Sequence, residues 1–186
     1  SSGIAVISKN KNTSFVKKSP GKINVLEKLV KARPLSGSIG IAQVRWATHG
    51  APNQANAHPH TDCKGEIALV HNGIIENYET LKTRLLKEGH LFRSQTDTEV
   101  IVHLIEGFYK NIPLEDAVRK ALKLVTGSFA IAVIAKHEPE KLVGARSGSP
   151  LIVGIGKNEN FLASDAPAIL EHTKNIIFLE ENEIAV

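Results

Sequence analysis

The sequence of 186 residues contains one cysteine, Cys63, and no methionine. A single cysteine cannot form a disulfide within the chain, which is typical of a reducing compartment. No apolar run approaches the roughly 20 residues needed to cross a bilayer, and the first residues lack the layout of a signal peptide. These absences predict a cytoplasmic protein with no membrane partner. Because a start methionine is missing, we expect a processed product or an excerpt of a longer chain.

Positive charge is concentrated near the N-terminus. The net charge is +4, but residues 1–36 hold eight Lys and Arg against one acidic residue, Glu27, so the remainder is negative. A basic segment can bind phosphates, but few aromatic residues lie among these lysines to stack on bases. We therefore predict a solvated basic face and no nucleic-acid partner, and nucleic-acid binding ranks third among the functional hypotheses for this sequence.

The hydrophobic pattern changes twice along the chain, from strands to helices and back to strands. This order is typical of an α+β fold with large, mostly antiparallel sheets covered by helices. No repeat or linker divides residues 1–186, so we predict one domain. The predicted strands are 3–8, 13–18, 38–46, 66–73, 127–136, 141–148, 150–156, 160–165 and 175–186. The predicted helices are 24–32, 77–89, one starting near Asp97, 113–125 and a short piece at 166–172.

Two of these helices carry detailed predictions. In the first, Val25, Leu26, Leu29 and Val30 recur at helical spacing and are expected to form its buried face. In the third, residues 96–99 read Thr-Asp-Thr-Glu, the pattern of a capping box, which predicts a helix start near Asp97.

Residues 45–60 read RWATHGAPNQANAHPH and contain three histidines and the one tryptophan. His58, His60 and Cys63 are three potential metal ligands within six residues, but zinc needs a fourth ligand or an open position. We predict a loop of partly exposed histidines and no metal. Cys63 is expected to be an inert surface thiol. Ser1 could use its own α-amine as a base, but it leads directly into a strand.

Asn72-Gly73 follows a strand and has two interpretations. Asn-Gly is a strong signal for a hairpin turn. Alternatively, the Asn72 amide and the Gly73 N–H could form an oxyanion hole for acyl transfer. Arg45 could bind a carboxylate, and Asp97 could be a helix cap or a partner for an ammonium group. Together these residues would hold both ends of an α-amino acid.

Six motifs in order, RWATHG, NAHPH, HNGIIEN, SQTDTEVI, ARSGSPL and NFLASD, extend over most of the chain. Together they resemble the glutaminase domain of the glutamine:fructose-6-phosphate aminotransferases, which are class II glutamine amidotransferases. The resemblance implies an N-terminal-nucleophile hydrolase fold, a four-layer αββα sandwich with two stacked antiparallel sheets. It also implies that an N-terminal cysteine attacks glutamine to release ammonia, which a sugar-isomerase domain uses to convert fructose 6-phosphate to glucosamine 6-phosphate.

The resemblance assigns roles to eight residues of this chain. The oxyanion hole is Asn72 and Gly73. The residues that bind or enclose glutamine are Arg45, Trp46, Thr48, His49, His58 and Asp97, with Trp46 in a closing loop. No cofactor or metal is implied. The implied partners are glutamine, a C-terminal sugar-phosphate isomerase domain and a second copy of the full-length protein.

The resemblance also has a gap, because neither Ser1 nor Cys63 falls at the position of the nucleophile. We expect the chain to lack the family's first strand and helix, to leave apolar surface uncovered, and to release no glutamate by itself. Two other hypotheses stay open. An amidotransferase could serve another acceptor, as in purine-pathway or asparagine-forming relatives, or the domain could sense an amino acid without catalysis.

Overall fold

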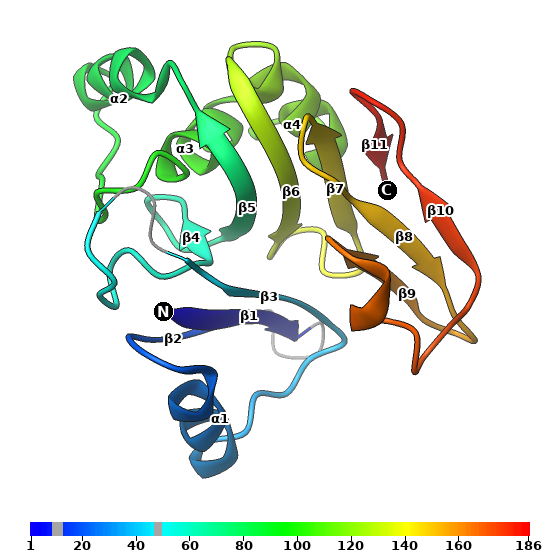
Figure 1. Cartoon of the computed structure of the whole chain (residues 1–186). Helices are drawn as coiled ribbons and strands as arrows, with labels where there is room; N and C mark the ends of the chain where they lie inside the picture. The colour runs from blue at the N-terminus through cyan, green and yellow to red at the C-terminus, as the bar shows by residue number, and fades with distance from the viewer. Residues whose placement is uncertain (9–12, 47–49) are drawn as a thin grey trace.

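The computed structural model describes residues 1–8, 13–46 and 50–186 (Figure 1). Its strands are β1 (Ser2–Ser8), β2 (Thr13–Ser19), β3 (Ile39–Val44), β4 (His60–Thr61), β5 (Ile67–Ile75), β6 (Gly127–Ala135), β7 (Leu142–Ser147), β8 (Ile152–Ile155), β9 (Asn160–Ala163), β10 (Ile176–Phe178) and β11 (Ile184–Ala185). Its helices are α1 (Ile23–Ala32), α2 (Tyr78–Lys87), α3 (Glu99–Phe108), α4 (Leu114–Leu122) and the 3₁₀ helix η2 (Ala166–Ala168).

A five-stranded antiparallel sheet in the order β11-β7-β6-β5-β4 lies at the centre of the fold. Side chains alternate between the two faces of a strand, and here both faces are covered. Leu69 of β5 and Ile131 and Val133 of β6 face the helices, whereas Ala68 and Ile134 face a second layer of strands. Both strands therefore consist largely of apolar residues.

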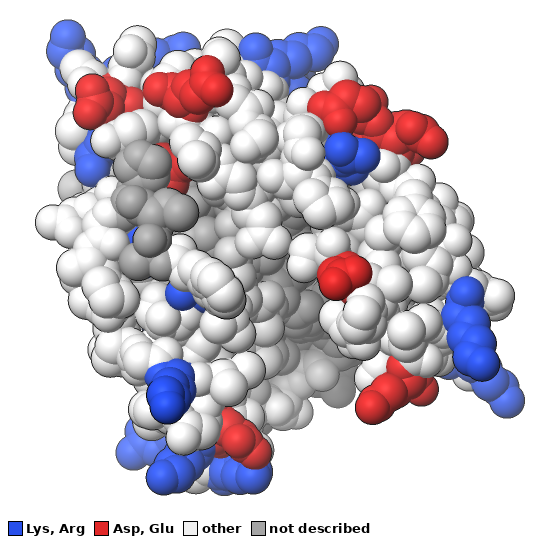
Figure 2. Space-filling view, viewed as in Figure 1, with Lys and Arg blue, Asp and Glu red and all other residues white. Residues whose placement is uncertain are grey.

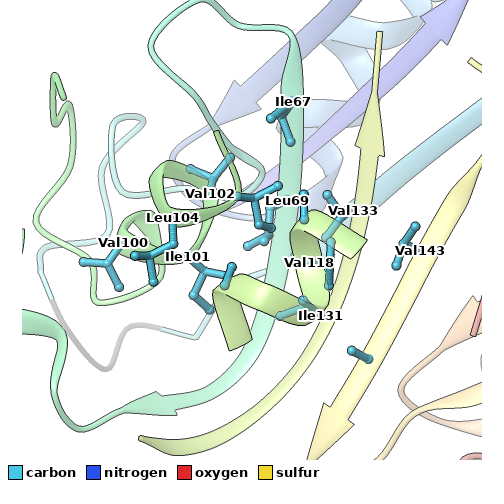
Figure 3. Packing of buried hydrophobic residues seen from close by; sticks show 14 of the residues in the cluster. Ile67, Leu69, Val100, Ile101, Val102, Leu104, Val118, Ile131, Val133 and Val143 are labelled. Carbon is cyan, nitrogen blue, oxygen red and sulfur yellow. The ribbon is translucent and has the colours of Figure 1, made fainter. Parts of the chain in front are cut away.

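Helix α3 forms the middle of the helical layer on one face of this sheet. All residues from Glu99 to Ile105 are buried, because α2, α4 and the sheet surround the helix. Figure 3 shows Ile101 and Leu104 packed in the same cluster as Leu69, Ile131 and Val118 of α4. A fully buried aliphatic side chain contributes about 1.5–3 kcal/mol. This core fixes the start of α3 against β5.

Two three-stranded sheets cover the other face of the central sheet. Sheet β2-β1-β3 packs through Ala5, Ile7 and Ile41, and α1 lies on its outer side. Sheet β10-β8-β9 packs against Ala130 through Leu151. The layers are thus helix, strands, strands and helix, which confirms the predicted α+β sandwich, although one strand layer consists of two sheets rather than one.

A cavity of about 460 Å³ separates those two sheets. It lies between β3 and β9 and reaches Val70 and Ala132 on the central sheet. Figure 2 shows this hollow in the middle of the face, surrounded mainly by uncharged side chains.

Several local predictions were wrong. On α1 only Leu26 is buried, while Val25 and Leu29 stay 43% and 45% exposed, because the helix lies on the outside of a small sheet. The piece at 166–172 forms only the short helix η2, and the predicted strand 175–186 divides into β10 and β11, which belong to different sheets.

Of the two interpretations of Asn72-Gly73, the hairpin turn is excluded, because β5 continues to Ile75 and both residues pair with β6. The capping box does not form either: α3 begins at Glu99, and its N-cap Thr98 makes no side-chain capping bond. Gly89, the last residue of the predicted helix 77–89, follows the C-cap Glu88 of α2 and has a φ of +92°, as is typical of a glycine that terminates a helix.

Charged groups of both signs lie around the visible face, with lysines and arginines gathered over α1 at the lower left (Figure 2). Across the ranges that the structure describes, no helix is both long and apolar enough to cross a membrane.

Candidate functional site

A cavity of about 190 Å³ lies where the end of β3, the middle of β5 and the segment before α3 meet. At about 30 Å³ per water molecule, it has room for roughly six waters, which suits a small polar molecule. The lining residues are Gln43, Val44, Arg45, Trp46, His58, His71, Asn72, Gly73, Asp97 and Thr98. Polar and charged groups predominate among them.

Arg45 and Asp97 are buried side chains of opposite charge on this cavity, 8% and 4% exposed. The guanidinium donates to the carbonyl oxygen of Gly50 at 3.2 Å. Burial lowers the pKa of Arg45 from its ordinary value, and the negative charge of Asp97 opposes that shift. Asp97 is held in place by the backbone N–H of Ile75, which donates to Oδ2 at 2.8 Å. The cavity therefore has a cationic and an anionic wall.

Gln43 fixes the orientation of the Asn72 amide. Its Nε2 donates to the carbonyl oxygen of His71 and to Oδ1 of Asn72, both at 2.8 Å. Because a carbonyl oxygen can only accept, Nε2 must be the donor, and Asn72 must present its oxygen to Gln43. The Nδ2 group of Asn72 is therefore the end available as a donor, and no acceptor for it occurs among the described residues.

Position 73 requires glycine for two reasons, the backbone conformation there and the closeness of β6. Its φ of +133° is rarely adopted by other residues, and a Cβ atom would lie 2.1 Å from the carbonyl oxygen of Ser128 on β6. The positive φ occurs within the paired part of β5, immediately after Asn72. Only glycine allows β5 and β6 to stay paired at this point of the cavity wall.

His58 and His71 are buried and neutral. Desolvation by burial lowers the pKa of both imidazoles, most strongly for His58. His71 Nε2 donates to the carbonyl oxygen of Ser128 at 3.3 Å, so its Nδ1 accepts from the hydroxyl of Thr98 at 2.9 Å. His58 Nδ1 contacts Oε1 of Gln43. The histidines thus contribute shape and hydrogen bonds without positive charge.

Six of the eight residues assigned from the sequence line this one cavity: Arg45, Trp46, His58, Asn72, Gly73 and Asp97. Trp46 lies at its rim, 88% exposed. Thr48 and His49 lie outside the described residues. Gln43 and Thr98 were missed, because Gln43 belongs to an apolar strand pattern and Thr98 to an apparent helix cap. The polar position of Gln43, two residues before Arg45, was the available signal.

The predicted loop of partly exposed histidines is wrong, because His58 and His60 are both buried and His60 belongs to β4. The residues considered for a metal or a nucleophile do not form one group. His60 Nε2 bonds Thr96 Oγ1 at 3.0 Å, whereas Cys63 lines a different cavity. Ser1 is held at the edge of the β1–β3 pair, where its carbonyl oxygen accepts from the Arg45 N–H at 2.7 Å. Among the residues placed by the structure, neither Ser1 nor Cys63 lines the cavity of Arg45 and Asp97.

Comparison with known proteins identifies the class to which this fold and site belong. Residues 45–171 match the family described as "Glutamine amidotransferase domain". The chain therefore belongs to the glutamine amidotransferase domain family.

The similar curated proteins are named glutamine--fructose-6-phosphate aminotransferase [isomerizing]. The protein from Aquifex aeolicus is 56% identical over the whole of this chain, which spans 31% of that protein. The one from Methanothermobacter thermautotrophicus is 55% identical over 92% of this chain and 29% of that protein. This chain thus corresponds to less than a third of the length of these relatives.

Solved structures support the fold. The structure of glutamine phosphoribosylpyrophosphate amidotransferase from B. subtilis aligns with a TM-score of 0.80 at 24% identity, covering 98% of this chain and 40% of that one. A glutamine aminotransferase class-II domain protein from Silicibacter pomeroyi aligns with a TM-score of 0.70 at 15% identity, covering 98% of this chain and 84% of that one. At these identities the likeness concerns the fold alone.

Proposed function

We propose that the cavity between β3, β5 and the start of α3 binds L-glutamine. The observation that carries this proposal is the presence of Arg45 and Asp97, buried and of opposite charge, on one small cavity. A guanidinium binds a carboxylate through two parallel hydrogen bonds, and a carboxylate binds an ammonium group. A free α-amino acid carries a carboxylate and an ammonium group on its α-carbon. Arg45 and Asp97 therefore suit the α-carbon end of such a molecule.

The other end of glutamine suits Asn72 and Gly73. Asn72 Nδ2 is oriented as a donor by Gln43, and the Gly73 N–H is the adjacent backbone donor. When a nucleophile adds to the side-chain carbonyl carbon, the amide oxygen gains negative charge that such donors stabilise. The neutral state of His58 and His71 leaves Arg45 as the charged group for the carboxylate. The class of reaction supported is hydrolysis of glutamine to glutamate and ammonia.

Nothing on the cavity wall, as far as the structure describes it, supplies a strong nucleophile. Cys63 lies on another cavity, and the Thr98 hydroxyl donates to His71, whose lowered pKa makes it a weak base. We therefore expect the 186-residue chain to bind glutamine without hydrolysing it. Glutamate release by the purified chain that is lost in Arg45→Ala would contradict this expectation, because such release would come from this cavity.

Binding can be tested through the one tryptophan, Trp46, at the rim of the cavity. We expect L-glutamine to change Trp46 fluorescence saturably, with one equivalent bound in calorimetry. Loss of a charge-assisted hydrogen bond costs about 1.5–3 kcal/mol, so Asp97→Asn should weaken binding roughly 10- to 150-fold. Asp116→Asn, on α4 and outside this cavity, is the matched control and should not change affinity.

Ligand analogues identify which wall binds which group. Glutamine without its α-amino group should bind wild type and Asp97→Asn with the same affinity, because this ligand has no ammonium group for Asp97 to bind. Glutamine without its α-carboxylate should likewise bind wild type and Arg45→Ala equally. If each variant instead weakens every ligand by the same factor, Arg45 and Asp97 do not act as proposed. Binding without any enzymatic role in the full-length protein would favour an amino-acid sensor.

For the protein as a whole, we propose that the released ammonia aminates fructose 6-phosphate. The proposal rests on relatives of that printed activity at 55% and 56% identity. It implies a C-terminal sugar-phosphate isomerase domain and a homodimer of the full-length protein. The test is formation of glucosamine 6-phosphate and glutamate from fructose 6-phosphate and glutamine by that protein. Amination of a different acceptor would contradict the proposal while leaving glutamine binding intact.

A further inference from the structure

A second cluster of reactive side chains lies outside the glutamine cavity. The ligand atoms of Cys63, His90, His103 and Glu106 all lie within 4.8 Å of one another. Cys63 follows β4, His90 follows α2, and the other two residues are on α3. Their separation in sequence is large, 27 residues from Cys63 to His90 and 40 from Cys63 to His103.

We propose that these four residues form a binding site for a zinc-class divalent cation. The distances fit tetrahedral coordination. Cys63 Sγ lies 3.7 Å from Nδ1 of both His90 and His103, and zinc–ligand bond lengths predict about 3.5 Å between sulfur and nitrogen ligands. Glu106 Oε2 lies 2.8 and 3.0 Å from the same two nitrogens, where about 3.3 Å is expected.

The short distances to Glu106 reflect hydrogen bonds that a metal would replace. Without metal, the imidazole N–H groups donate to the Glu106 carboxylate. With metal, the nitrogens and the carboxylate bind the cation, and a carboxylate shift of a few tenths of an ångström gives tetrahedral spacing. The Glu106 side chain is 19% exposed at the edge of the cluster. Thiolate and imidazole ligands favour zinc or a similar transition metal over magnesium or calcium.

Residues around the cluster orient its ligands, as in known metal sites. The Leu91 N–H donates to Cys63 Sγ at 3.3 Å, a hydrogen bond that a metal-bound sulfur would keep. The other nitrogen of His103, Nε2, is buried and lies 3.7 Å from Glu99 Oε1. Glu99 is itself held by the backbone N–H of Ser94 at 2.7 Å. A carboxylate behind a ligating histidine is a common feature of zinc sites.

A cation can reach this cluster from solvent. A cavity of about 600 Å³ is lined by Cys63, His90 and Glu106. The bound ion would join the turn after β4, the connection after α2 and helix α3. Because Asp97 and Thr98 precede α3 and line the glutamine cavity, the metal would stabilise the part of the fold that positions them. The sequence-based prediction of no metal considered Cys63 together with His58 and His60, whereas the structure groups Cys63 with His90, His103 and Glu106.

The test uses the 186-residue chain without a polyhistidine tag. The protein is reduced and treated with a chelator to remove bound metal, and it is then titrated first with Co²⁺ and afterwards with Zn²⁺. We expect one equivalent of Co²⁺ to produce a thiolate-to-metal charge-transfer band and the intense visible bands of tetrahedral cobalt. Zn²⁺ should remove both and raise the melting temperature. Because Cys63 is the one cysteine, the charge-transfer band of the wild-type chain identifies it as a ligand without the need for a variant.

Variants complete the assignment. Cys63→Ser should abolish the band and weaken Zn²⁺ binding more than about tenfold, and Glu106→Gln should weaken it while retaining the band. His137→Asn is the matched control, because His137 lines the same cavity but is not among the four ligands. The proposal is overturned if Co²⁺ gives no charge-transfer band, or if Zn²⁺ neither binds as one equivalent nor stabilises the chain.

Discussion

Replacing Gly73 with alanine should separate a steric effect from a backbone effect at the glutamine cavity. The added Cβ would lie 2.1 Å from the carbonyl oxygen of Ser128, and the residue would keep a φ of +133°. Strain of that backbone conformation costs about 1–3 kcal/mol, and overpacking costs about 1–3 kcal/mol more. Since the obstacle is backbone of a paired strand, β5 and β6 must move apart. We expect Gly73→Ala to lower the free energy of unfolding by about 2–6 kcal/mol.

Two other glycines provide the controls. Gly89 has a φ of +92°, but a Cβ added there would have no described atom within 4 Å, so Gly89→Ala should show only the backbone cost. Gly107, on α3, has neither a positive φ nor a close neighbour, so Gly107→Ala should stabilise the chain by about 0.5–1 kcal/mol. The assay is urea denaturation followed by circular dichroism. The reasoning is refuted if Gly73→Ala costs no more than Gly89→Ala.

Three further substitutions test the core, the half-buried Lys18 and the anchoring of the site. Ile101→Ala should cost about 2–5 kcal/mol, whereas Leu86→Ala, at a 51% exposed position, should change stability by less than about 0.5 kcal/mol; equal effects in denaturation would contradict the described core. Burial lowers the pKa of Lys18 to about 8 from 10.5, so the folded protein binds fewer protons and should gain stability as pH rises between these values. Lys18→Met should remove that gain, and parallel stability–pH curves for the two proteins would exclude the shift. Asp97→Ala should be about 1–3 kcal/mol less stable than Asp97→Asn, because it leaves the buried N–H of Ile75 unpaired; equal denaturation midpoints would show that this bond does not matter.

The predictions that succeeded depended on local signals. The order of strands and helices predicted an α+β fold, since a half-buried or fully buried element must have a matching pattern of apolar residues. The four-layer αββα sandwich was implied by the family resemblance. The end of the helix at Gly89 was predictable because helices commonly terminate at a residue with positive φ, which glycine adopts readily. Six motifs in order also identified Arg45, Asn72 and Asp97 as candidates for one site, which the cavity brings together.

The predictions that failed depended on neighbours distant in sequence. Asn72-Gly73 has the composition of a turn, but pairing with β6 extends the strand through both residues. Asp97 and Thr98 have the composition of a helix cap, but they bond Ile75 and His71 on β5 instead. In each case a tertiary partner competes with the local hydrogen bond that the sequence favours.

The sequence by itself determined the class of fold and the residues that carry charge and hydrogen-bonding groups, because those follow from local pattern and side-chain chemistry. Only the tertiary structure decided which of these groups meet. It placed Arg45, Asp97 and His58 on one cavity and Cys63 on another. It also brought Cys63 to His90 and His103, across 27 and 40 residues. Contacts between residues so far apart in sequence depend on the packing of α3 against the central sheet, which no local pattern encodes.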